Sequence, residues 1–174
     1  MSMPRIPELK VVTAMTMCLA VAALGFTQSE GRARQTNANA PSAARAEIDA
    51  FNKKYIAAHL RMDNAAVLSL WADDGISLLP ATDPIIGKEA IGKFMNEVMG
   101  RMPGYHMQKM DVDFQGIEVS GNWASEWAEE HQVVQPPPGK RVIDSYGKLL
   151  LVLHREADGN WRITREMWNQ GLKP

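Results

Sequence analysis

The chain has 174 residues, of which 45% are hydrophobic, 22% charged and 7% aromatic, a composition typical of one globular domain with an additional segment. Its 19 basic and 20 acidic residues give a formal net charge of −1. We expect no nucleic-acid partner, because this balance lacks the excess of basic residues that neutralises a phosphate backbone. The single cysteine, Cys18, cannot form an internal disulfide, and the sequence has no zinc-site spacing.

The N-terminal segment predicts export. Two basic residues precede an apolar run of 16 residues, 11–26, which only two threonines interrupt. Because roughly 20 residues are needed to cross a bilayer, the run favours a cleaved secretory signal over a permanent membrane anchor. Three alanines offer the small residue that cleavage requires: Ala22, Ala23 and Ala33. We therefore predict a signal peptide over residues 1–33, a mature chain starting between Ala23 and Arg34, and a periplasmic or secreted protein.

Three helices are predicted after a flexible lead-in. Residues 34–44 lack a periodic apolar pattern and form this lead-in, so the domain is assigned to residues 45–172. From Ile48 to Met62, apolar residues recur at steps of three and four, which predicts a helix. We expect Asn64 to cap a second, shorter helix that includes Trp71 and ends at residues 73–75. A third helix should follow Gly87.

Strands are predicted for the rest of the domain. A short strand is expected at residues 76–79, and after Pro103 the apolar period changes from that of a helix to that of a strand. Gly116 interrupts the alternation as a bulge or turn would. Three further strands are predicted at residues 123–134, 142–156 and 161–169. Helices followed by a long antiparallel meander indicate an α+β fold, in which the sheet must curl around the first helix to bury their shared faces.

Three segments carry a resemblance to a known family: residues 46–74, 86–91 and 147–169, the last reading GKLLLVLHREADGNWRITREMWN. On these segments the chain resembles the nuclear-transport-factor-2-like superfamily, in its SnoaL-like branch related to ketosteroid isomerase. The resemblance implies three N-terminal helices packed in a strongly curved, mostly antiparallel sheet that forms a cone with an internal pocket. Members include isomerases, dehydratases, epoxide hydrolases, cyclases and non-catalytic binders, so the fold does not select a chemistry.

The mechanism of ketosteroid isomerase does not transfer to this sequence. Tyr55 matches the position of the isomerase's oxyanion-binding tyrosine. The catalytic base, however, would fall near Leu79, and the second oxyanion acid near Leu151. Neither leucine can transfer a proton, so we do not expect steroid isomerisation by that route.

The resemblance also implies which strand residues face the cone. Successive strand residues face opposite sides. If Ala124 and Ala128 let the first helix approach the sheet, Glu126 and Glu130 point inward. Two tryptophans of the same strand, Trp123 and Trp127, then point outward. On the last two strands the residues implied to face inward are Thr164, Glu166, Trp168, Leu149, Leu151 and Leu153.

These placements assemble a candidate pocket. Tyr55 and His59 lie one helical turn apart and point the same way. The candidate catalytic residues are Glu166, His59 and Tyr55, and the candidate lining residues are Glu126, Trp168, Trp71, Leu151 and Thr164. Each also has a structural interpretation: a core aromatic, a histidine at the end of a buried stripe, or a glutamate paired with an arginine. No ligand motif links His59 to the glutamates, so we expect neither a metal nor another cofactor.

Two functions from different classes follow. The first is an exported isomerase, dehydratase or related lyase that moves a proton on a small, largely apolar substrate. The second is a non-catalytic module that binds a small molecule or a second copy of itself. Outward-facing Trp123 and Trp127 favour a homodimer in either case. A pocket with two or more convergent titratable groups would support the enzyme, and a filled or purely apolar cone would support the binding module.

Overall fold

The computed structural model describes residues 40–173. The predicted signal peptide, 1–33, and the first part of the lead-in lie outside these residues. Among the residues that are described, none of the helices combines the length and apolar character needed to span a membrane.

Helix α1 (Ala40–Leu60) begins within the segment that we assigned to the lead-in, so residues 40–44 are helical rather than flexible. Its buried stripe follows the predicted period, because Ile48, Phe51 and Tyr55 are at most 5% exposed. The burial of this stripe against the sheet stabilises the helix, as is usual for amphipathic helices.

The second helix differs from the prediction at both ends. In α2 (Asn64–Ser69) the cap is Asp63, whose carboxylate accepts a hydrogen bond from the Ala66 amide at 3.0 Å. Asn64 instead donates from its side chain to Asn96 at 2.9 Å. Trp71 was wrongly placed in this helix, because it begins a strand that pairs with the distant Ile163. Helix α3 (Lys88–Gly100) follows Gly87 as predicted.

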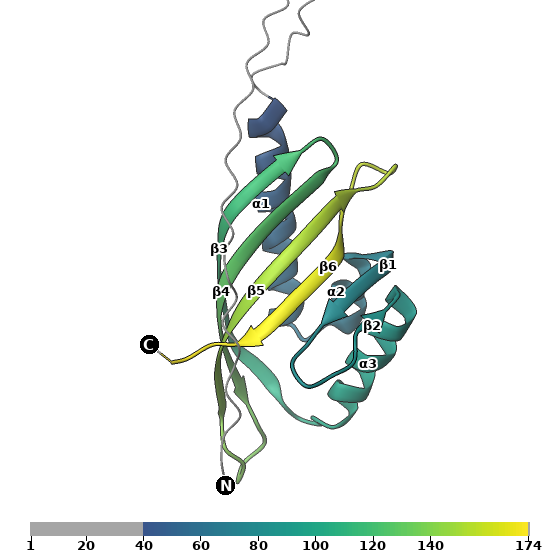
Figure 1. The fold of residues 1–174 in the computed structure, drawn as a ribbon. Coiled ribbons are helices and arrows are strands. Elements are labelled where there is room, and N and C mark those ends of the chain that lie inside the picture. Colours follow the sequence, from purple (N-terminus) through teal and green to yellow (C-terminus); the bar gives the residue numbers. More distant parts are fainter. Residues whose placement is uncertain (1–39, 174) are drawn as a thin grey trace, which may run out of the picture. The chain divides into compact units, whose positions relative to one another are not determined.

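Six strands form one sheet in the order β2-β1-β6-β5-β4-β3, and Figure 1 shows α1 lying across one face of it. All neighbouring strands are antiparallel except β1 and β6, which run parallel. The structure therefore confirms the predicted α+β class and its mostly antiparallel sheet. The strands are β1 (Trp71–Leu78), β2 (Ile85–Ile86), β3 (His106–Ser120), β4 (Trp123–Gln135), β5 (Ile143–Arg155) and β6 (Trp161–Gln170).

The inward and outward faces of β4 agree with the prediction. Ala124, Glu126, Ala128 and Glu130 are all at most 5% exposed, whereas Trp123 and Trp127 on the opposite face are 51% and 42% exposed. The small alanine side chains leave room for α1, which keeps the tryptophans out of the core. The glutamates are consequently held inside the domain.

The register of the sheet shifts at four places, and only the one at Gly116 was predicted. Gly116 has a φ of 58° where β3 shifts register against β4, as its position in the sequence indicated. Another shift lies between β5 and β6, where Val152 pairs with Arg165 but Leu153 pairs with Ile163. Thr164 is the additional residue at this bulge. The alternation therefore changes at Thr164, and counting back from Glu166 in steps of two assigns it to the wrong face.

A glycine in β5 supplies a test of this packing. A methyl group at Gly147 would overlap the indole of Trp168, which packs directly over it. We expect Gly147→Ala to lower the free energy of unfolding by about 1–3 kcal/mol, measured by urea denaturation. The new methyl group would force either the backbone of β5 or the indole of Trp168 to move.

Gly100→Ala is the matched control. No atom lies within 4 Å of a methyl group at Gly100, so this substitution should be neutral or slightly stabilising. Equal stabilities of the two variants would contradict the close approach of Trp168 to β5.

Candidate functional site

Tyr55 lies at the centre of the polar groups inside the domain. Its side chain is 3% exposed, its ring lies 4.1 Å from that of His59, and it meets Phe114 of β3 edge-on at 6.1 Å. Burial raises the pKa of Tyr55 well above its usual value, and the negative charges of Glu166, Glu130 and Glu126 raise it further. The hydroxyl therefore stays protonated and can donate a hydrogen bond. Three glutamates, two on β4 and one on β6, thus act on the pKa of Tyr55 through their charges.

Glu166 is the most suitable of these glutamates for proton transfer. It is partly exposed on β6, and Ser77 of the parallel strand β1 donates a hydrogen bond to its Oε1 at 3.3 Å. Burial raises the pKa of Glu166 to about 7, the Ser77 hydrogen bond lowers it, and the charge of Glu130 raises it. Both protonation states are therefore populated near neutral pH, as a general acid or base requires.

Glu130 and Trp168 form a second polar contact in the same interior. The indole Nε1 of Trp168 donates to Glu130 Oε1 at 3.0 Å, and the amide of Gln132 donates to the same oxygen. Burial raises the pKa of Glu130, and these hydrogen bonds lower it. Trp168 therefore fixes a carboxylate as well as providing apolar surface.

His59 lies one turn after Tyr55 on α1 and is partly exposed. Its Nδ1 is 2.8 Å from the Tyr55 carbonyl oxygen. A carbonyl only accepts hydrogen bonds, so Nδ1 carries the proton and Nε2 is the free acceptor of the neutral ring. Burial lowers the pKa of His59, and the bond to Tyr55 raises it. The ring is therefore a neutral proton acceptor at pH 7.

Glu126 and Leu151 lie deeper in the core. Glu126 is 1% exposed and accepts a hydrogen bond on Oε2 from Asn52 Nδ2 at 2.8 Å. Leu151 is fully buried and pairs with Glu126 across β4 and β5. Both residues face inward as predicted, and both are packed among other side chains.

Thr164 and Trp71 do not join the residues around Tyr55. Thr164 donates from Oγ1 to the Val152 carbonyl oxygen at 3.0 Å, since the bulge turns its side chain away from Glu166. It borders a cavity of about 610 Å³ together with Trp123 and Arg162. Trp71 belongs to the core and borders the same cavity. The assignment of Thr164 to the interior pocket was therefore wrong, and Trp71 is a packing residue.

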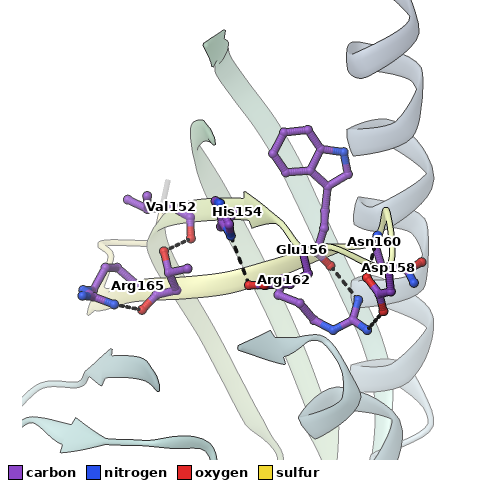
Figure 2. Close-up of polar contacts among 9 residues, drawn as sticks. Val152, His154, Glu156, Asp158, Asn160, Arg162 and Arg165 are labelled. Carbon is purple, nitrogen blue, oxygen red and sulfur yellow. Dashed lines mark hydrogen bonds and ion pairs between the residues drawn. The ribbon is translucent and has the colours of Figure 1, made fainter. Parts of the chain in front are cut away.

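Most of the ionisable side chains that line this outer cavity have a partner. Arg162 contacts Asp158 at 3.0 Å, and His154 contacts Glu156 at 3.1 Å, as Figure 2 shows. Lys88 lies 3.7 Å from Asp73 on another wall. Because these charges stabilise one another at the surface, we place the candidate site around Tyr55 instead. No three His, Cys, Asp or Glu side chains within residues 40–173 are arranged to hold a metal ion.

Three contributors were missed from the sequence: Asn52, Ser77 and Phe114. Asn52 carried a usable signal, because a polar residue next to Phe51 on the apolar stripe of a helix must find a partner in the core. Ser77 carried none, since its contact with Glu166 depends on a parallel pairing across 89 positions. Phe114 was recognised only as a residue of an alternating strand.

Comparison with known proteins identifies the family. Residues 40–166 match the family model of the SnoaL-like domain. None of the curated proteins compared with the chain is similar to it in sequence.

Solved structures share the fold at low sequence identity. A ketosteroid isomerase-like protein from Erwinia carotovora is 22% identical, with a TM-score of 0.63 over 74% of this chain and 96% of that one. A candidate dehydratase of the nuclear-transport-factor-2-like family from Streptomyces avermitilis is 16% identical, with a TM-score of 0.66 over 76% of this chain and 100% of that one. The chain therefore belongs to the SnoaL-like family and has the nuclear-transport-factor-2-like cone fold.

Proposed function

We propose that this domain binds a small, largely apolar molecule inside its cone and moves a proton on it, as an isomerase, dehydratase or related lyase. The observation that carries the proposal is Glu166, a partly exposed carboxyl group whose pKa is about 7 and whose charge acts on the buried Tyr55. A carboxyl group that served only as a surface charge would remain ionised at neutral pH. The predicted signal peptide supports a site of action outside the cytoplasm.

Each residue then has a defined role. Glu166 in its ionised form takes a proton from the substrate. Tyr55, whose raised pKa keeps it protonated, donates a hydrogen bond to the negative charge that develops on the substrate. Trp168 provides apolar surface beside the carboxylates, and His59 Nε2 is available to accept or return a proton. Low polarity around the charges strengthens each of these interactions.

The alternative is a non-catalytic binding module with the same pocket. The partly exposed Glu166, His59 and Trp168 would then contact the ligand by hydrogen bonding and packing alone. Several titratable groups inside the domain, with raised pKa values at Glu166, Glu130 and Tyr55, favour the enzyme. Proton exchange between ligand and solvent distinguishes the two.

The first prediction concerns Glu166→Gln. Small ketones and hydroxy-ketones incubated with the protein in D₂O should gain deuterium next to the carbonyl, detected by mass spectrometry, if a base removes that proton. We expect Glu166→Gln to slow this exchange roughly a hundredfold or more, since a positioned acid–base group contributes about that much. Tyr55→Phe should slow it less.

Glu97→Gln, which removes an exposed carboxylate from α3, is the matched control and should exchange at the wild-type rate. If the Glu166→Gln variant keeps both its fold and the wild-type rate, Glu166 is structural and the binding module is the better interpretation.

The second prediction uses Ser77. Its hydrogen bond stabilises the ionised form of Glu166, so Ser77→Ala should raise the Glu166 pKa further above 7. The exchange rate should rise with pH as Glu166 loses its proton, and in Ser77→Ala this rise should move to higher pH. A ¹³C titration of the Glu166 side-chain carboxyl carbon measures the pKa directly. A pKa that is unchanged or lower in the variant would contradict the contact.

We also propose that two copies associate through the outer face of the sheet. Trp127, Leu150 and Met167 lie side by side on β4, β5 and β6, and each is more than 40% exposed. Charges of both signs border this apolar row, with Glu129 and Lys148 on one side and Arg165 on the other. A second copy presents the same row and both signs of charge, which makes the surface suitable for a two-fold contact.

Sedimentation at micromolar concentration tests this association. The described domain should sediment as a dimer, and Leu150→Asp, at the centre of the row, should convert it to a monomer. Ile86→Asp changes an even more exposed apolar residue, on β2, and should leave the dimer intact. A wild-type monomer would refute the proposal.

A further inference from the structure

Glu126 is a buried acid that the proposed chemistry does not use. It points from β4 toward α1, between Ala124 and Ala128, and pairs across the sheet with the fully buried Leu151. Asn52 of α1, 5% exposed, donates one hydrogen bond to Oε2 at 2.8 Å. The hydrogen bond between Asn52 and Glu126 therefore joins α1 to β4, and both of its partners are almost completely buried.

The contact leaves two oxygens without partners. Glu126 Oε1 and Asn52 Oδ1 are both buried, and neither accepts a hydrogen bond from the protein. A buried acceptor without a donor destabilises a protein by about 1–3 kcal/mol. Neither oxygen is exposed to bulk solvent. A proton carried by one of the two side chains would supply the missing donor.

We propose that Glu126, in its protonated and neutral form below neutral pH, makes a reciprocal pair with Asn52. The amide N–H of Asn52 donates to Oε2, and the acid proton on Oε1 donates to Asn52 Oδ1. A single proton thus gives a partner to both unpaired oxygens and removes a negative charge from the core.

The surroundings of Glu126 favour this neutral form. Burial raises its pKa to about 7 even though the Asn52 hydrogen bond lowers it, and among the nearby charges Arg45 lowers it and Asp49 raises it. Arg45 and Asp49 are roughly half exposed on α1 and lie 3.5 Å from each other, so their effects on Glu126 oppose one another. Tyr55 of α1 is neutral, and the β5 residue opposite Glu126 is Leu151. None of these groups provides a strong countercharge for an ionised Glu126.

The pair makes Glu126 a positioning residue for Tyr55. Asn52 precedes Tyr55 by three positions and therefore lies on the same side of α1. The reciprocal bonds fix this turn of the helix against β4 and so fix where the Tyr55 hydroxyl lies. This consequence rests on the proposed function, whereas the protonation of Glu126 does not.

Protonation predicts how stability depends on pH. The pKa of Glu126 is raised in the folded protein, so between about 4.5 and about 7 the folded chain holds a proton that the unfolded chain has lost. Its contribution to stability is therefore largest in acid and falls as pH rises through this window. Glu126→Gln keeps both hydrogen bonds, because the new amide donates to Asn52 Oδ1 and accepts from Asn52 Nδ2.

The test is a ¹³C titration of the protein labelled at glutamate side-chain carboxyl carbons, with the Glu126 signal assigned by its loss in Glu126→Gln. We expect the chemical shift of a protonated carboxyl group at pH 5.5. Glu126→Gln should remain folded, and its thermal midpoint should fall less than that of the wild type between pH 5 and pH 8. Glu129→Gln, which removes a neighbouring carboxylate on the outer face, should keep the wild-type pH dependence.

A Glu126 signal that is ionised at pH 5.5, or a Glu126→Gln variant with the wild-type pH dependence, would overturn the proposal. Glu166→Gln separates this result from the function of the domain. That variant should keep the protonated Glu126 signal whether or not Glu166 takes part in catalysis.

Discussion

The packing of α1 against one face of the sheet determines the interior of this domain. Ala124 and Ala128 leave space for the helix, and this choice of face necessarily directs Glu126 and Glu130 inward. Carboxyl groups placed in an apolar interior must find donors or take up protons. Their partners come from three other elements: Asn52 on α1, Trp168 on β6 and, for Glu166, Ser77 on β1. The polar network is thus a consequence of helix packing.

Local patterns in the sequence predicted most of the fold. The spacing of apolar residues located α1, α3 and the four long strands. Each of these elements buries one face, so apolar residues recur in its sequence at the period of a helix or of a strand. The errors lie where distant segments decide the structure. Trp71 was assigned to a helix because its pairing with Ile163 leaves no signal in the neighbouring sequence. Thr164 was assigned to the inward face because the bulge between β5 and β6, which interrupts the alternation there, was not predicted.

Part of the candidate site was predictable. The rings of Tyr55 and His59 lie 4.1 Å apart, because one helical turn places both side chains on the same face of α1. The hydrogen-bond partners that set the protonation of the glutamates were not predictable, because each comes from another part of the chain. The titratable groups could therefore be identified from the sequence, but their exposure and hydrogen-bond partners depend on tertiary contacts. Glu166 reaches solvent, whereas Glu126 is enclosed with Asn52.

The parallel pairing of β1 with β6 also determines when the site can form. Ser77 and Glu166 are separated by 89 positions, and Glu166 belongs to the last strand of the sheet. Contacts of such long sequence separation form slowly, because a long loop must close before they contribute. During synthesis, the first helix and the first strand leave the ribosome well before the carboxylate does. The growing chain consequently cannot bring Ser77 and Glu166 together, and the proposed acid–base centre forms only after the whole sheet has closed.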